Sequence, residues 1–155
     1  MEIQIIQTTE LNSESKTQKF ATILNRILSN IKMIHWYIKD YNKHQIFGDL
    51  YTDLSDLFDS LQEEIIGTQR DKDLDFPEFD RDSTFRDEDF QNYLDDKSMV
   101  DYYFTTYDNI INVLLSYEFE NYVKNSKSGI LNTRDEIITR FNKTNYLINL
   151  TNNEK

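Results

Sequence analysis

The sequence predicts an all-α protein whose helices form a four-helix bundle. Its 155 residues include only three glycines and one proline, so residues that end helices or bend strands are scarce. Apolar residues recur at alternating steps of three and four, which is the spacing of one helical face. Ten Phe and ten Tyr compensate for a hydrophobic fraction of 38%. The chain is therefore long enough and apolar enough to bury the core of one domain.

The first two helices are predicted on either side of an interruption at residues 41–44. An N-terminal arm, residues 1–14, precedes the first helix at residues 15–41. The second helix is closed by Gly67, because glycine tolerates the left-handed conformation found at helix C-termini. The apolar faces are Phe20, Leu24, Ile27, Ile31, Ile34 and Ile38 in the first helix, and Phe47, Leu50, Leu54, Leu57, Phe58, Leu61 and Ile65 in the second.

A long acidic crossover is predicted over residues 69–97. Between Arg70 and Lys97 the chain carries eleven acidic and five basic residues, together with its only proline, Pro77. A short helix is expected at residues 88–94. The scattered phenylalanines of this segment favour packing along the bundle.

The third helix is predicted from Ser98 to a short loop at residues 125–129. The fourth helix follows, with Asn132 or Thr133 as its N-cap, and its apolar face is expected to extend to Tyr146 and Leu150. Two helix pairs joined by one long crossover match the connectivity of ferritin-like bundles. The predicted fold is a ferritin-like four-helix bundle over residues 15–155.

The charge and the absence of cysteine limit the classes of partner. The formal net charge of −11 repels the phosphates of nucleic acids and anionic lipid headgroups, so neither nucleic acid nor membrane is expected as a partner. Without cysteine, disulfides and thiolate metal sites are excluded. Residues 1–7 lack the basic start and long apolar run of a secretory signal. We expect a cytoplasmic protein.

Four residues are the candidate metal ligands. The only two histidines, His35 and His44, lie near the end of the first predicted helix and the start of the second. Asp59 and Glu63 are four residues apart in the second helix, so they project from adjacent turns of one face. Two imidazoles and two carboxylates suit iron, with manganese or zinc as substitutes.

The order His35-Trp36, His44 and Asp59-x-x-x-Glu63 resembles the Dps family, the DNA-protection-during-starvation branch of the ferritin-like proteins. The specific similarity covers residues 35–68. It implies an iron-binding protein that oxidises Fe(II) with peroxide or oxygen and stores the product. It also implies a twofold dimer, or a larger shell, in which histidines of one subunit and carboxylates of its partner share the metal.

Periodicity within the second helix agrees with a site between subunits. At about 100° per residue, its core face and its acidic face, Asp56, Asp59 and Glu63, lie roughly opposite one another. Asp59 and Glu63 should therefore point away from their own core. A di-iron centre inside one bundle needs inward-facing Glu-x-x-His motifs, and no histidine occurs in the third or fourth helix.

Three features depart from the family pattern. The interval between His35 and His44 is shorter than the family's, which predicts a tighter turn and a displaced His44. Gly48 stands where the family commonly has a carboxylate one turn after the second histidine, which weakens the case for a second iron position. Neither end has a Lys-rich tail, which argues against DNA compaction.

A different class of function remains open, a helical assembly or interaction module that is metal-free or holds metal only structurally. A calcium loop starting at Asp71 is disfavoured, because its sixth position is Phe76 rather than glycine and its twelfth is Asp82 rather than glutamate. Nucleophilic catalysis has no support without cysteine or a phosphate-binding glycine loop.

Overall fold

Helices account for all the regular structure in the described part of the chain. The computed structural model describes residues 16–69, 95–123 and 128–153. In chain order the helices are α2 (Lys16–Tyr37), α3 (Tyr41–Gln69), α6 (Asp96–Leu114), the short α7 (Tyr117–Tyr122) and α8 (Ser128–Asn153). The predicted all-α class is confirmed. The predicted arm, the acidic segment 70–94 with its short helix, and the calcium-like loop lie outside the described residues.

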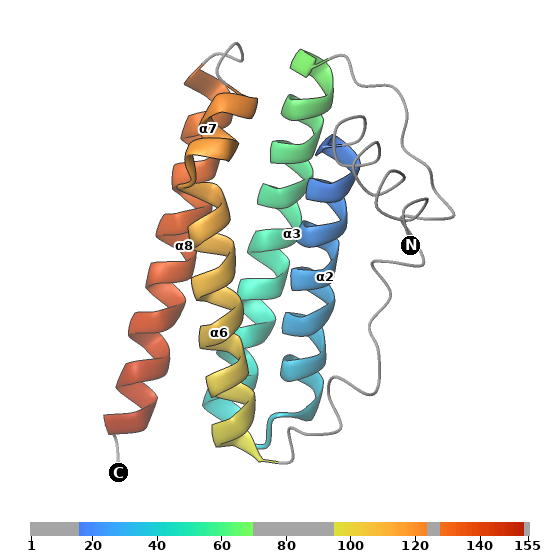
Figure 1. Ribbon diagram of the computed structural model, residues 1–155. Coiled ribbons are helices and arrows are strands. Elements are labelled where there is room, and N and C mark those ends of the chain that lie inside the picture. The colour runs from blue at the N-terminus through green and yellow to red at the C-terminus, as the bar shows by residue number, and fades with distance from the viewer. Residues whose placement is uncertain (1–15, 70–94, 124–127, 154–155) are drawn as a thin grey trace, which may run out of the picture.

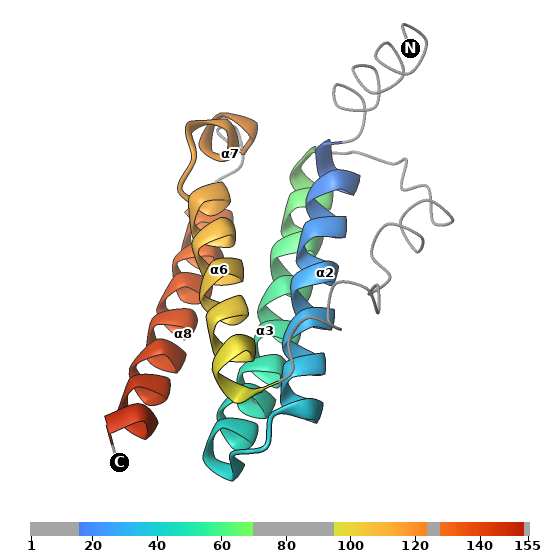
Figure 2. The ribbon, with the colours of Figure 1, turned by 60° about the horizontal axis from the view of Figure 1, so that its bottom comes forward.

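The four long helices pack side by side as a bundle (Figure 1). Helix α3 packs most closely against α2 and α8, and α6 contacts the same two neighbours. Helix α3 ends at the end of the bundle opposite to the start of α6, so these two helices run in the same direction (Figure 1). The turned view shows α2 beside α3 and α6 beside α8 (Figure 2). The predicted long connection between the second and third long helices is confirmed.

The core lies between the four helices and is built from their apolar faces. Aromatic packing joins helices distant in sequence: the rings of Phe47 and Tyr103 meet edge to face with centroids 5.2 Å apart. The fully buried Tyr103 donates its hydroxyl to Asn145 Oδ1 at 2.7 Å. The largest fully buried aliphatic side chains are Ile31, Ile34, Leu50, Leu54, Leu61, Ile65, Ile110, Leu114 and Ile130.

The turn between the first two helices is shorter than predicted and lies earlier. Helix α2 ends at Tyr37 rather than at residue 41, and residues 41–44 form the first turn of α3. The reason is a cap: Asp40 Oδ2 accepts a hydrogen bond from Lys43 N at 2.9 Å, and Asp40 O accepts one from His44 N at 2.9 Å. The connection is therefore only residues 38–40.

The third predicted helix is divided in two. Asp95 forms a capping box with Ser98, so α6 starts at Asp96 rather than at Ser98. At the other end, Ser116 Oγ donates to Val113 O at 2.7 Å and accepts from Phe119 N at 3.0 Å. This serine ends one helix and caps the next, because its hydroxyl competes for backbone groups.

The last helix begins before the predicted cap. Helix α8 starts at Ser128, so the prediction of Asn132 or Thr133 as its cap is wrong. Thr133 is buried instead, with its hydroxyl 3.0 Å from Glu64 Oε2 of α3 and 3.1 Å from Gly129 O. Tyr146 and Leu150, predicted on the apolar face, are exposed.

Candidate metal centre

The tight turn brings the two histidines together. His35 lies in the last turn of α2 and His44 in the first turn of α3. Their rings stack face to face, with centroids 4.1 Å apart and planes inclined by 16°. Only residues 38–40 separate the two helices, and His44 is held directly against His35. The displacement of His44 relative to the family pattern stays a prediction.

Each ring is fixed by the backbone of the other histidine. His35 Nδ1 lies 2.8 Å from His44 O, and His44 Nδ1 lies 2.7 Å from His35 O. A carbonyl oxygen only accepts hydrogen bonds, so both Nδ1 atoms carry hydrogen and donate. In the neutral rings the lone pair is then on Nε2, the arrangement that commonly orients metal-binding histidines.

Gly48 provides the space for the His35 ring. A Cβ atom at this position would lie 2.7 Å from His35 Cε1 and 2.9 Å from Nδ1, closer than real Cβ atoms approach other groups. Glycine inside a helix is unfavourable relative to alanine. The close approach of the imidazole explains why glycine occupies this position in α3.

The turn itself is held by a carboxylate from another helix. Asp96, the first residue of α6, accepts hydrogen bonds from Lys39 N at its Oδ1 and from Asp40 N at its Oδ2, both at 2.8 Å. These two backbone amides belong to the three-residue turn, where no helix supplies acceptors for them. The start of α6 is thereby joined to the α2–α3 connection.

Comparison with known proteins adds no assignment. No protein-family model, curated protein or solved structure matches the chain.

Asp59 and Glu63 lie apart from the histidines within one chain. Both are exposed on α3, on the outward side opposite the buried Leu54, Leu61 and Ile65. Asp59 follows His44 by fifteen residues, about 22 Å along the axis at roughly 1.5 Å per residue. Among the described residues no group of three or more His, Asp or Glu side chains is placed to hold a metal ion. The four-residue ligand set stays a prediction.

The stacked rings are unsuited to chelating a single ion. A bound metal lies close to the plane of the imidazole, about 2.0–2.1 Å from the nitrogen. Planes that are stacked and inclined by only 16° do not meet at that distance. Without repacking, each Nε2 must take its own ion.

Sequence reasoning identified the histidines but missed the residues that support them. Asp40, three residues before Lys43, carries a local cap signal that was available. A glycine inside a helical pattern, such as Gly48, signals a close approach. Asp96 had no such signal, since its partners lie more than fifty residues away in the sequence.

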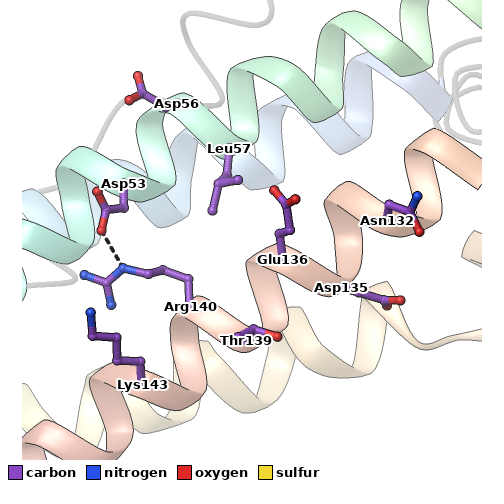
Figure 3. A pocket seen from close by; sticks show the side chains of 9 residues that line it. All are labelled: Asp53, Asp56, Leu57, Asn132, Asp135, Glu136, Thr139, Arg140 and Lys143. Atoms are coloured by element: carbon purple, nitrogen blue, oxygen red, sulfur yellow. Dashed lines mark hydrogen bonds and ion pairs between the residues drawn. The ribbon is translucent and has the colours of Figure 1, made fainter.

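Apart from the histidine pair, a groove of about 760 Å³ lies between α3 and α8 (Figure 3). Arg140 reaches across it to Asp53, with Nε and Oδ2 2.6 Å apart, and also donates to Thr144 Oγ1 at 2.8 Å. Glu136 points into the groove beside Leu57 (Figure 3). The Arg140–Asp53 ion pair joins α8 to α3, and neither histidine lines this groove.

None of the described helices combines the length and apolar character needed to cross a membrane.

Proposed function

We propose that the protein is a Dps-like member of the ferritin-like superfamily that binds Fe(II) and oxidises it at a site shared by two copies of the chain. The observation that carries the proposal is the reciprocal histidine pair, in which backbone carbonyls fix both rings with Nε2 available as a ligand. The bundle supports it as well, because two antiparallel helix pairs with one long crossover are the ferritin-like arrangement.

The second copy is needed for the carboxylates. Imidazoles hold Fe(II) well, whereas carboxylate oxygens suit the harder Fe(III) product. Asp59 and Glu63 face outward and cannot reach the histidines of their own chain. A twofold axis beside α2 and α3 would place the acids of each copy near the histidines of the other, in the reciprocal way that such interfaces require.

The two histidines suit a two-electron oxidant. If each imidazole holds one Fe(II), the pair supplies two electrons, although Gly48 stands where the family commonly has a carboxylate for the second ion. Hydrogen peroxide takes one electron from each ion and two protons, and leaves as two molecules of water. Iron is here the substrate of the protein, and the acidic surface would receive the ferric product.

Iron titration tests the proposal directly. Anaerobic Fe(II) followed by peroxide should give a ferric absorbance rise in the wild type, and His35→Ala or Glu63→Ala should lose it. The control is Asp108→Ala, which removes an exposed acid from α6 and should behave as wild type. A wild-type protein that binds no Fe(II) would refute the proposal.

Mixing the two defective variants tests the shared site. When His35→Ala and Glu63→Ala chains are refolded together, a mixed dimer has one site with both residues intact and one with both lost. Random pairing should therefore restore about a quarter of the wild-type sites. A site contained within one chain would show no recovery.

The alternative, an assembly module in which metal is absent or purely structural, has one observation in its favour. Three large aromatic side chains near the turn are exposed: Trp36 by 58%, Tyr37 by 56% and Tyr41 by 70%. Exposed aromatic groups of this size are typical of interfaces. Native mass combined with metal analysis separates the two functions, since a metal-free assembly supports only the second.

A further inference from the structure

We propose that Asp96 is a positioning residue for the histidine pair, acting through the turn that joins α2 and α3. This proposal rests on the proposed function, in which the histidine pair binds metal. The positioning of the two rings can itself be measured without metal. Its basis is the pair of hydrogen bonds from Lys39 N and Asp40 N to the two oxygens of the Asp96 carboxylate.

The stacking of the two rings depends on the conformation of the turn. Two residues lie between His35 and the turn, and three lie between the turn and His44. The stack requires the last turn of α2 and the first turn of α3 to keep one relative orientation, because each Nδ1 must reach the other residue's carbonyl. A change in the backbone at residues 38–40 would alter both hydrogen bonds together.

Asp96 is held in place independently of the turn. The adjacent Asp95 side chain accepts from Ser98 N at 2.8 Å, and the Asp95 backbone N–H donates to Ser98 Oγ at 3.3 Å in return. The capping box fixes the first turn of α6 and leaves the Asp96 side chain to bind the two amides. A charged acceptor with two oxygens matches two neighbouring N–H donors, and such charge-assisted bonds are among the stronger ones.

Asp95 and Asp96 form a matched pair for experiment. Asp95→Ala removes the cap of α6 and leaves the turn's two acceptors in place. Asp96→Ala removes both acceptors from the turn and leaves the cap. Asp96→Asn keeps one carbonyl oxygen and places an NH₂ group against the other amide, which is a milder change that preserves volume.

The deciding measurement is imidazole NMR on the metal-free protein. In the wild type we expect both rings in the Nδ1–H tautomer with slowly exchanging Nδ1 protons. In Asp96→Ala the exchange of both protons should rise about tenfold, with Asp96→Asn intermediate, because the acceptors of two amides are lost. Asp95→Ala should raise the exchange less than Asp96→Asn does, because it loosens the first turn of α6 but keeps both carboxylate oxygens at the α2–α3 turn.

Equal exchange rates in the Asp95 and Asp96 variants would overturn the proposal, because a purely structural role would affect both alike. If Asp96→Ala does not fold, the comparison of Nδ1 proton exchange is made between Asp96→Asn and Asp95→Ala, and equal rates would again overturn the proposal. Zn²⁺ titration of the same proteins gives a second comparison, with weaker binding expected only in the Asp96 variants. A wild type that binds neither Zn²⁺ nor Fe(II) refutes the proposed function but leaves the NMR result standing, so the two failures are distinguishable.

Discussion

At the scale of single residues, the contrast between two glycines of the same helix is informative. Gly48 lies against the His35 ring, whereas a Cβ at Gly67 would have nothing within 4 Å. Both are in α3, which continues past Gly67 to Gln69 rather than closing at this glycine as predicted. Inside a helix, alanine has the higher propensity by about 0.8–1.0 kcal/mol. The same substitution should therefore have opposite consequences at the two positions.

Gly67→Ala should raise the free energy of unfolding by up to about 1 kcal/mol. Gly48→Ala should not raise the free energy of unfolding, because its Cβ must displace the His35 imidazole and break the reciprocal hydrogen bonds. Urea unfolding compares the stabilities, and imidazole NMR reports the ring. An undisturbed His35 signal in Gly48→Ala would contradict this account of the glycine.

At the scale of elements, the junction of α6 and α8 contains a ladder of two tyrosines. Tyr103 OH donates to Asn145 Oδ1 at 2.7 Å, and Tyr107 OH donates to Asn142 Oδ1 at 2.9 Å. The two tyrosines are four residues apart along α6, and their two asparagine partners are three residues apart in the opposite direction along α8. These two hydrogen bonds therefore fix the register of the antiparallel helices. Burial raises the pKa of Tyr103 far above its ordinary value of 10.0, with the nearby Tyr107 acting in the same direction and Arg140 opposing it.

Stability should therefore fall at alkaline pH. Tyr103 stays protonated in the folded chain but ionises in the unfolded chain above pH 10.0, so its contribution is complete below that pH and is lost as the pH rises further. Unfolding free energies measured by urea between pH 9 and 11 should decline more steeply in the wild type than in Tyr103→Phe. Tyr117→Phe, at a side chain 80% exposed, is the control and should keep the wild-type slope.

Substituting Tyr103 should also be destabilising at neutral pH. Tyr103→Phe removes the donor and leaves the Asn145 side-chain oxygen without its partner, at a cost of about 1–3 kcal/mol. The exposed Tyr117→Phe should change the free energy of unfolding by less than about 0.5 kcal/mol. Equal losses in the two variants would show that the buried hydrogen bond contributes little.

At the scale of the whole molecule, charge and metal should control association in opposite ways. A net charge of −11 makes two copies repel one another at low ionic strength. Metal shared between copies would favour the pair, and linkage requires that association and metal binding strengthen each other by the same factor. Both effects would act only on the association of two copies and have no counterpart in a single chain.

Sedimentation velocity should show tighter self-association when salt is raised and when Zn²⁺ or anaerobic Fe(II) is added. The metal effect should disappear in Glu63→Gln, while the salt effect should persist. Self-association that strengthens with salt but does not change when metal is added would favour the assembly module over the proposed metal site.

The sequence predicted best what depends on local spacing. Helical faces such as Leu54, Leu61 and Ile65 follow from a period that each segment carries within itself. Local caps such as Asp40 and Ser116 moved the predicted helix ends by a few residues. Other features depend on a distant partner: Thr133 looks like a cap but is buried against Glu64, and Asp96 acts on a turn far along the chain. The spacing of the histidines indicated proximity but not the stacked geometry. The proposed site needs Asp59 to meet a histidine of a second chain, and spacing within one chain does not encode such a contact.

The reciprocal bonds of the histidine pair make its two halves separable. Each ring is oriented by a peptide carbonyl, which every residue type possesses, rather than by its neighbour's imidazole. Replacing His35 with alanine removes one ring but retains the acceptor that orients His44, and the converse holds for replacing His44. Single substitutions should therefore leave the remaining ring with its backbone acceptor in place, so the orientation of each ring can be tested separately by imidazole NMR.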